Sequence, residues 1–473
     1  MDTKKLRQKI LDLAIRGKLV PQDPNDEPAS VLLERIRAEK QQLIKEGKIK
    51  APKGSKACDT SHYEKIEGPF EIPESWEWVR LGDISNYGQC ENVDVSRISP
   101  ESWTLELEDI EKDSAKIIAF QNIKKRPLKG VRHRFLAGDV LYSKLRTYLN
   151  KVLVAPKDGY CTTEIIPIKS YSGVSRNYMC YVLRSNYYLD YTSSLGFGVK
   201  MPRLSTNDAI KSLIPIPPYN EQIRIVKAIQ DACDTLERIE SAQENVTTQI
   251  SLIKSKILSL AISGDLVPQD PNDEPAIELL RRINPDFKPC DNSHYGNLPE
   301  GWTIATVADV FEINPKVQAS DDIDAGFVPM ANICDGFNNA FSFETKKWAK
   351  IKNGFSRFAD GDIAVAKISP CLENRKSVIL RGLPNGIGAG TTELNTFRSA
   401  VVVPEYGLIF FKSDEFIKKC AGSYNGVVGQ QRVSRSLIEE MQFLVPPIKE
   451  QYRIVAMVEK HFNAIDRIDR ALL

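Results

Sequence analysis

The chain contains two copies of one eleven-residue string, LVPQDPNDEPA, at Leu19–Ala29 and at Leu266–Ala276. The copies stand 247 residues apart, and the residues that precede them, Leu11–Lys18 and Leu258–Asp265, are also similar. An identity of this length inside one chain indicates a tandem duplication, and such a repeat constrains the fold before any other feature is considered. The chain is therefore predicted to be built twice from one plan.

Further matching strings border the two halves. CDTSHY at Cys58–Tyr63 matches CDNSHY at Cys290–Tyr295, and PPYNEQIRIV at Pro217–Val226 matches PPIKEQYRIV at Pro446–Val455. Between these strings the two interiors differ greatly. The two halves therefore share their border segments, which we call the frame, and differ in the domains between these segments.

Helices are predicted over residues 3–17 and 29–45, because apolar residues there recur at helical spacing and Gly17 is a typical stop. A basic linker follows over residues 45–56, which is either a solvated tether or a contact for nucleic acid or a partner. From Asn220 to Gly264 apolar residues alternate at intervals of four and three, which predicts a coiled-coil helix ~60 Å long. Its seam positions are Ile225, Ile229, Ala232, Leu236, Ile239, Gln243, Val246, Ile250, Ile253, Ile257 and Leu260.

Both chain ends repeat parts of this central helix. At an offset of 229 residues, the C-terminal residues Ile454, Val458, His461, Ile465, Ile468 and Leu472 fall on the front of the seam. At an offset of 247 residues, Leu6, Ile10 and Leu13 fall on its back. We predict a pseudo-two-fold circular arrangement, in which one long helix is continuous and its antiparallel mate is split between the two ends.

The remaining sequence indicates an α+β fold with two repeated mixed α/β domains. Short β-like runs alternate with Gly and Pro between residues 72 and 218, and a helix is predicted at Tyr178–Leu183. The predicted segments are 1–64 (repeat helices and basic linker), 65–218 (first mixed α/β domain), 219–295 (central helix and repeat segment), 296–447 (second mixed α/β domain) and 448–473 (C-terminal helix).

Composition places the chain among soluble globular proteins, since 42% of its 473 residues are hydrophobic and 27% are charged. No apolar run approaches the ~20 residues that cross a bilayer, and the N-terminal residues do not resemble a secretory signal. The nine cysteines are scattered singly, which favours a reducing cytosol and argues against disulfides and zinc. A cytoplasmic protein is expected.

A search for catalytic motifs argues against several enzyme classes. The sequence has no GxxxxGK[ST] string for a nucleoside triphosphate and no HExxH zinc motif. An [ND]PP[YF] string, which would hold the amino group of a flipped adenine, is also missing, because Ile216 precedes Pro217-Pro218-Tyr219. The four histidines are far apart in the sequence, so neither a catalytic triad nor a metal site is indicated.

Basic residues are concentrated locally although the formal net charge is only +2. Residues 116–151 contain ten Lys or Arg and a single acid, Asp139. Lys and Arg neutralise phosphates, while Arg, Asn and Gln read base edges through paired hydrogen bonds. A solvated basic surface is the alternative interpretation. The candidate DNA-binding residues are Gln121, Asn122, Lys124, Lys125, Arg126, Lys129, Arg132, Arg134, Lys144, Arg146, Arg203, Lys346, Lys347, Lys350, Lys367, Arg375, Lys376 and Arg432.

Short strings recur in the same order in both halves. They are IPESW (Ile72–Trp76) and LPEGW (Leu298–Trp302), GDVL (Gly138–Leu141) and GDIA (Gly361–Ala364), TTE (Thr162–Glu164 and Thr391–Glu393), MPRLS (Met201–Ser205) and GQQRVS (Gly429–Ser434), and EQxRIV from Glu221 and from Glu450. With these strings the chain resembles, over nearly all its length, the specificity subunits of type I restriction–modification enzymes.

The resemblance implies a DNA-recognition subunit that is not itself an enzyme. In that family two target recognition domains each read one half of a bipartite, asymmetric DNA sequence. The repeated helices dock two N6-adenine methyltransferase subunits, and restriction subunits with motor and nuclease activity complete the complex. S-adenosylmethionine, ATP and Mg²⁺ are then used by these partners, and no cofactor is expected in this chain. The helix positions expected at subunit interfaces are Ile225, Ile229, Leu236, Ile239, Ile250, Ile257, Ile454 and Ile465.

Two other functional classes stay open. One is a methyltransferase fused to its own recognition domains, against which the missing methyl-donor motif counts. The other is a stand-alone bipartite DNA-binding regulator, which would bind its site tightly without partners.

Overall fold

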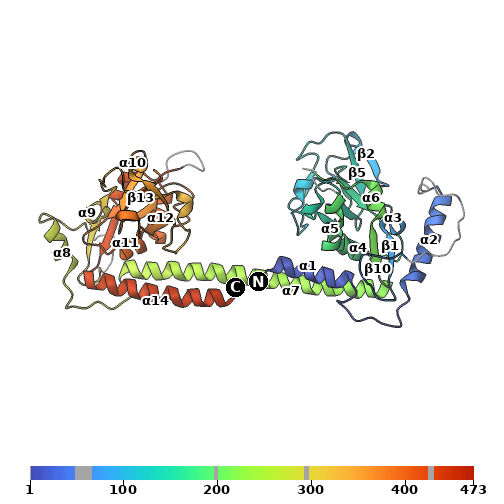
Figure 1. Ribbon diagram of the computed structural model, residues 1–473, viewed down its shortest axis with the longest axis horizontal. Coiled ribbons are helices and arrows are strands. Elements are labelled where there is room, and N and C mark those ends of the chain that lie inside the picture. The colour runs from blue at the N-terminus through green and yellow to red at the C-terminus, as the bar shows by residue number, and fades with distance from the viewer. Residues whose placement is uncertain (1, 48–65, 196–200, 292–297, 424–430, 473) are drawn as a thin grey trace. The chain divides into compact units, whose positions relative to one another are not determined.

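The computed structural model describes residues 2–47, 66–195, 201–291, 298–423 and 431–472. They form two compact units, Met1–Ser241 and Ala242–Leu473. Each unit mixes helices and strands, as predicted, and the long helix α7 (Tyr219–Ser263) contributes its first part to one unit and its last part to the other (Figure 1). Several predicted features lie outside the described residues. They are most of the basic linker, most of the two CD(T/N)SHY strings, Gly429-Gln430 and the predicted boundaries at 64/65 and 295/296.

The first unit pairs its helices with three sheets. Its helices are α1 (Thr3–Ile15), α2 (Ala29–Lys45), α3 (Leu81–Ile84), α4 (Arg176–Arg184), α5 (Asn186–Leu195) and α6 (Thr206–Lys211). Its strands are β1 (Glu77–Arg80), β2 (Glu91–Asp94), β3 (Trp103–Leu105), β4 (Gln121–Asn122), β5 (Val131–Phe135), β6 (Val140–Ser143), β7 (Val152–Val154), β8 (Gly159–Cys161), β9 (Ile165–Ile168) and β10 (Leu213–Ile216). The sheet orders are β1-β10, β2-β5-β8-β3-β4 and β7-β6-β9.

The second unit has the same kind of organisation. Its helices are α8 (Ala276–Ile283), α9 (Val307–Val310), α10 (Trp348–Ile351), α11 (Pro404–Phe411), α12 (Asp414–Ala421), α13 (Arg435–Glu439) and α14 (Ile448–Leu472). Its strands are β11 (Thr303–Thr306), β12 (Glu312–Ile313), β13 (Asp324–Val328), β14 (Glu344–Lys347), β15 (Ser356–Ala359), β16 (Ile363–Ala366), β17 (Ser377–Ile379), β18 (Ile387–Gly390), β19 (Leu394–Arg398) and β20 (Gln442–Val445). The sheet orders are β11-β20, β12-β19-β16-β17 and β14-β13-β18-β15.

In each unit the first and last strands pair antiparallel and close off an outer domain. Glu77 of β1 lies opposite Ile216 of β10, and Thr303 of β11 lies opposite Val445 of β20. We call residues 77–216 the first outer domain and residues 303–445 the second. The chain therefore enters and leaves each outer domain through two adjacent strands, and each domain is attached to its helices at this one junction.

Both copies of the repeated string leave their helices through the same turn. Gly17 and Gly264 have φ angles of +67° and +83°, a left-handed conformation that glycine adopts without steric cost and that commonly ends helices. A Cβ atom at Gly17 would lie 2.4 Å from Pro73 Cγ, and one at Gly264 would lie 2.4 Å from Pro299 Cγ. The predicted helix stop at Gly17 is confirmed, and its cause is a close approach of two chain segments as well as a turn.

The first residue of each EQxRIV string anchors the repeated string. Glu221 accepts hydrogen bonds from Trp76 Nε1 at 2.9 Å and from Gln22 Nε2 at 2.6 Å. Glu450 accepts from Gln269 Nε2 at 3.2 Å. Burial raises the pKa of both glutamates, while these donors oppose the rise. The glutamate of EQxRIV therefore connects the start of a helix to the LVPQDPNDEPA string in both units, which explains why it recurs.

The glutamine and arginine of EQxRIV have equally defined partners. Gln222 accepts from the Ser175 N–H at 2.8 Å, as Gln451 does from the Val403 N–H at 2.8 Å. Arg224 pairs with Asp26 at 2.6 Å and Arg453 with Asp273 at 2.6 Å. Buried polar groups without such partners would be costly, so these strings are explained by folding alone.

Two shorter helices lie antiparallel to the two parts of α7 (Figure 1). In the first unit, Arg7 of α1 pairs with Glu240 at 2.9 Å, whereas Asp26, after α1, pairs with Arg224. In the second unit, Asp466 of α14 pairs with Lys254 at 2.5 Å. Residue numbers thus rise along one helix as they fall along its neighbour.

The buried stripe of α7 departs from the predicted seam in its second part. Ile225 and Ile229 are buried, as expected, but Ile253 is 49% exposed. The buried positions there are Leu258, Ala261 and their neighbours. The reason is that α7 packs against an outer domain as well as against a second helix, so its buried face is broader than a coiled-coil seam and is turned from it.

Candidate nucleic-acid interface

Three backbone segments meet in the first outer domain. The Lys144 N–H donates to the Glu164 carbonyl at 3.0 Å, and the Lys144 carbonyl accepts from the Leu204 N–H at 2.8 Å. The Arg146 N–H donates to the Pro202 carbonyl at 2.8 Å. These bonds join the turn after β6 to the TTE and MPRLS strings. We call residues 144–146, 162–164 and 202–204 the first cradle.

The second outer domain contains the same arrangement. The Lys367 N–H donates to the Glu393 carbonyl at 3.0 Å, the Val433 N–H donates to the Lys367 carbonyl at 3.0 Å, and the Ser369 N–H donates to the Gln431 carbonyl at 2.9 Å. We call residues 367–369, 391–393 and 431–433 the second cradle. Strings that are scattered in the sequence are therefore brought together twice, in domains that otherwise differ.

In each cradle a glutamate orients an arginine. Arg203 Nη2 lies 2.9 Å from Glu164 Oε1. Arg432 makes a two-bond pair with Glu393, in which Nε–Oε2 is 2.9 Å and Nη2–Oε1 is 2.7 Å. This pair lowers the pKa of the Glu393 carboxyl and raises that of Arg432. A guanidinium carries five N–H donors, so a carboxylate fixes its plane and leaves donors for a second acceptor.

The first cradle contains one predicted residue with an unusual backbone conformation, Arg146, and two residues that the sequence did not single out lie next to the cradle in the chain. Arg146 is exposed and has a φ of +51°, which non-glycine residues seldom adopt and which is often found at functional sites. Tyr148 and Met201 are each 48% exposed beside it. Their signal in the sequence was weak, since a single tyrosine or methionine in a basic stretch is usually a core residue.

The other predicted DNA-binding residues of the first outer domain are distributed along the five-stranded sheet, whose two edge strands are β4 and β2. Asn122 Nδ2 donates to Glu101 at 3.1 Å, and Lys124 Nζ lies 3.2 Å from the same carboxylate. Gln121 is half-buried on β4. The further basic residues that are exposed are Lys125, Lys129 and Arg134, the last of which lies 3.4 Å from Glu91. Gln121, Asn122 and Lys124 therefore lie at the β4 edge of the sheet, whereas Arg134 of β5 lies next to β2 at the other edge.

Two predicted DNA-binding arginines of this domain are internal ion-pair partners. Arg126 makes a two-bond pair with the buried Asp109, at 2.8 and 2.5 Å. Arg132 lies 3.1 Å from Glu106, and both side chains are largely covered. Their guanidinium groups are committed to the fold, so we no longer regard them as DNA contacts.

In the second outer domain, Lys346 and Lys347 are held on β14. Lys346 lies 2.9 Å from Glu344 and 3.8 Å from the Phe327 ring centre, and Lys347 lies 2.9 Å from Asp324. Lys350 of α10 is exposed. These lysines offer screened charge on the surface, which suits contact with a phosphate backbone better than reading of bases.

Arg375 and Lys376 are also turned inward, contrary to prediction. Lys376 Nζ donates to the Ile333 carbonyl at 2.7 Å, as Lys151 Nζ does to the Leu107 carbonyl at 2.7 Å in the first domain. Arg375 is bound by Asp414 and by Ser255. The sequence could not reveal these partners, because they are distant along the chain.

Half of the eight predicted subunit-interface residues are buried inside their own units. Ile225, Ile229, Leu236 and Ile454 are buried, and Ile239, Ile250, Ile257 and Ile465 are half-buried. The buried members cannot present a surface to another subunit. Exposed apolar side chains occur instead at two positions that match at the 229-residue offset, Ile223 (46% exposed) and Tyr452 (61% exposed).

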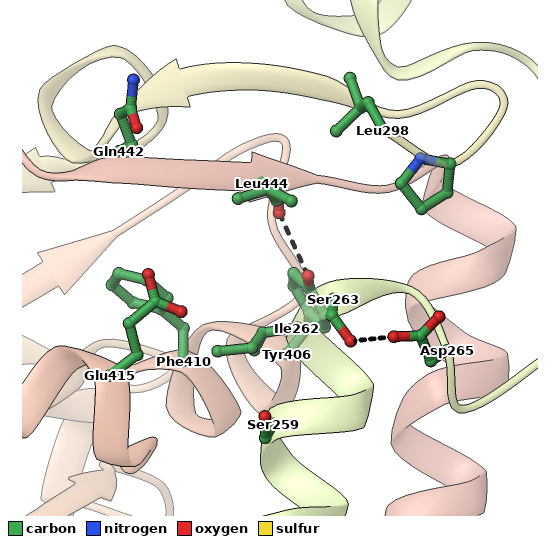
Figure 2. A pocket seen from close by; sticks show the side chains of 11 residues that line it. Ser259, Ile262, Ser263, Asp265, Leu298, Tyr406, Phe410, Glu415, Gln442 and Leu444 are labelled. Carbon is green, nitrogen blue, oxygen red and sulfur yellow. Dashed lines mark hydrogen bonds between the residues drawn. The ribbon is translucent and has the colours of Figure 1, made fainter. Parts of the chain in front are cut away.

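A cavity of about 270 Å³ lies in the second unit between α7, α11 and β20 (Figure 2). Tyr406 and Phe410 line it, and Ser263 at its rim donates to Asp265 at 2.6 Å. In the first unit Arg16 matches Ser263 at the 247-residue offset, and its guanidinium lies 4.2 Å from the Phe70 ring centre. None of the residues that line this cavity belongs to a cradle, so the cavity is not part of the shared site.

Within the described residues, no group of three His, Cys, Asp or Glu side chains could hold a metal ion. None of the helices in these same segments is long and apolar enough to cross a membrane.

Parts of this chain are similar to known proteins. Residues 299–472 match the family described as type I restriction modification DNA specificity domain. The specificity subunits of the type I restriction enzymes EcoAI and EcoEI from Escherichia coli are 41% and 40% identical over 243 residues, which is 47% of this chain. The chain spans 41% of the length of these curated relatives.

The fold also has a solved counterpart. A chain from structures on complex assembly and conformational transition of the type I R-M system superposes with a TM-score of 0.60 at 16% identity, over 85% of this chain and 94% of that chain. The resemblance to type I specificity subunits that the repeated strings predicted is therefore confirmed.

Proposed function

Because residues 299–472 belong to the type I restriction modification DNA specificity domain family, we propose that this chain is the DNA-specificity subunit of a type I restriction–modification complex. In this role it selects the DNA sequence and catalyses no reaction itself. The duplicated cradle carries the proposal, since the same three-segment geometry occurs in two domains whose other residues differ.

Each cradle has the chemistry of a base reader. An arginine whose plane is fixed by a carboxylate can donate two parallel hydrogen bonds, which is how arginine recognises guanine in the major groove. Arg203 and Arg432 are held in this way. The exposed lysines around the cradles would contact phosphates, which strengthens binding without selecting sequence.

Two unlike readers on one frame imply a bipartite, asymmetric target. Lys144 and Arg146 occupy the first cradle where Lys367 and Ser369 occupy the second, so the two half-sites differ. The spacing between half-sites is set by the frame, as the geometry of a dimer sets the spacing of operator half-sites. We infer that the frame is the predicted pseudo-two-fold circular arrangement, which the antiparallel ion pairs along each part of α7 support.

The proposed partners are two N6-adenine methyltransferase subunits and the restriction subunits. Two copies of one partner require two equivalent surfaces, and the repeat supplies them. Ile223 and Tyr452 are exposed apolar residues at matching positions of α7 and α14, and exposed apolar side chains on otherwise polar helices favour a protein interface. S-adenosylmethionine, ATP and Mg²⁺ would be bound by these partners.

Co-expression with a type I methyltransferase subunit tests the proposal. The two proteins should copurify, and the methyltransferase should modify adenines at defined sites only when this chain is present. Tight, sequence-specific binding by the chain alone, with no copurifying methyltransferase, would favour the stand-alone regulator. Methylation by the chain alone would favour a fused methyltransferase.

A further inference from the structure

Each outer domain touches its helices at a second place, beyond the shared junction. This second contact lies at the same place in both units, but different residues form it. Arg184, at the end of α4, donates to the Asp113 and Ser114 carbonyls at 2.8 and 3.1 Å. Lys412, at the end of α11, donates to the Gly336 and Arg375 carbonyls at 2.7 and 2.9 Å. Equivalent helices thus hold equivalent loops.

In the first unit the loop that contains Asp113 reaches the helices through ion pairs in solvent. Lys4 of α1 lies 2.7 Å from Asp113, and Lys116 lies 3.1 Å from Glu237 of α7. The Lys116 and Glu237 side chains are 67% and 51% exposed. Exposed pairs of this kind contribute little to stability and are screened by salt.

In the second unit the two cations of the contact are largely covered from solvent. Arg375 pairs with Asp414, donates to Ser255 Oγ of α7 at 3.0 Å, and places its guanidinium 4.6 Å from the Phe337 ring centre. The Phe337 ring meets the Phe462 ring of α14 edge-on, with centres 5.7 Å apart. The Arg375 side chain is only 13% exposed.

Lys254 completes this second contact. Its Nζ lies 2.5 Å from Asp466 of α14 and 5.3 Å from the Phe462 ring centre. The Lys254 side chain is 10% exposed. Cation–π and ion-pair interactions that are shielded from water are stronger than surface pairs and respond less to ionic strength.

Both contacts connect directly to a cradle. The Asp113 N–H donates to the Leu149 carbonyl at 3.1 Å, three residues beyond Arg146 of the first cradle. Arg375 follows the second cradle's Ser369 along one loop, in which the Asn374 N–H donates to the Pro370 carbonyl at 3.0 Å. Movement of either contact would therefore reach the recognition surface.

We infer that Arg375, together with Phe337 and Lys254, is a positioning group that fixes the second cradle on its helices. At the equivalent place in the first unit, the loop that leads to the first cradle is attached to the helices through surface ion pairs, and this loop loosens as salt rises. The two readers of one chain thus differ in rigidity. The inference about half-site reading rests on the proposed function, whereas the difference in attachment does not.

Hydrogen exchange of the full-length chain tests the attachment without DNA. On raising salt from about 0.1 M to about 1 M, exchange should increase several-fold in peptides around residues 110–116 and change less than about two-fold around 333–337. Equal responses of the two regions would overturn the inference. In Lys116→Ala the first region should exchange fast already at low salt, whereas an unchanged rate would overturn it as well.

The complex assembled with its methyltransferase subunits tests the positioning role. Arg375→Ala should lower discrimination about ten-fold at one half-site and leave discrimination at the other half-site unaltered. Arg375→Lys, which keeps the charge but loses the planar stack, should restore part of it. A uniform loss at both half-sites, or no loss in a folded variant, would contradict the positioning role. Absence of any sequence-specific binding by the unsubstituted complex would instead refute the proposed function.

Discussion

Arg432 donates two parallel hydrogen bonds to the Glu393 carboxylate, the last residue of one TTE string. In the other unit Arg203 donates to Glu164, the last residue of the other TTE string. The paired carboxylate carries negative charge toward a surface that is proposed to bind DNA. Such a charge is unfavourable for phosphate binding in general. Its presence in both cradles is explained if orientation of the arginine matters more than total positive charge.

Replacing this glutamate should therefore separate specificity from affinity. In Glu393→Gln, binding to unrelated DNA should stay equal or become tighter, while the preference for the target should fall about ten-fold, because a misoriented arginine loses paired readout of a base. Dissociation constants for target and scrambled duplexes measure both. Glu101→Gln, which frees the surface residue Lys124, is the matched control. Weaker binding to all sequences alike would contradict the orienting role.

Arg126 and Lys125 are neighbours with different expected roles. Arg126→Ala leaves the buried Asp109 carboxylate without its partner, which should cost about 3 kcal/mol of unfolding free energy. Lys125→Ala should leave stability within about 0.5 kcal/mol and should reduce the salt dependence of DNA binding. Urea unfolding and binding at several salt concentrations distinguish the two. Similar stabilities of the two variants would show that Arg126 is a surface residue after all.

The turns at Gly17 and Gly264 offer a test of the repeated junction. Alanine at either position meets both an unfavourable positive φ and a proline atom at 2.4 Å. Each substitution should cost more than about 2 kcal/mol. Gly47 also has a positive φ, +68°, but nothing lies within 4 Å of its Cβ position. Gly47→Ala should therefore cost only about 1 kcal/mol, and an equal cost at all three positions would refute the close approach.

Lys412 should make the stability of the second unit depend on pH. Burial, and then the nearby Arg375 charge, lowers the pKa of Lys412 to about 7. The unfolded chain keeps this proton up to a pKa of about 10.4, so between these values the native state binds fewer protons and stability rises with pH. The slope should reach at most about 1.4 kcal/mol per pH unit.

The substitution Lys412→Met should remove that rise. Urea unfolding of the second unit, followed between about pH 7 and pH 9, measures it. The first unit serves as an internal control, because it has Arg184 in place of the lysine at the corresponding position. Parallel pH profiles for the unsubstituted chain and the variant would exclude Lys412 as the cause.

The repeated strings allowed much of the frame to be predicted. The helix predicted over residues 29–45 is α2, and the helix predicted from Asn220 to Gly264 is α7 within one residue at each end. These predictions succeeded because periodicity and stop signals are local. The exposure of Ile253 could not be predicted in the same way. A heptad pattern describes packing between helices only, whereas α7 also packs against an outer domain, which changes the face that is buried.

The cradles were harder to predict than the helices. Lys144, Arg146 and Arg203 are close together in space, but a basic stretch in a sequence does not distinguish them from Arg126, whose acidic partner lies 17 residues away. The partners of Arg375 are even farther away in the sequence: Asp414 is 39 residues distant, and Ser255 of α7 is 120 residues distant. Composition indicates where positive charge is concentrated, and only the tertiary fold decides which charges are neutralised internally.

The most direct test of two independent readers on one frame is a domain exchange. Residues 72–216 would be replaced by the corresponding domain of another specificity subunit, and methylated adenines would be mapped in the DNA of cells that express the complex. The account predicts a target in which one half-site changes while the other half-site and the spacing are retained. A change in both half-sites, or in the spacing alone, would contradict it.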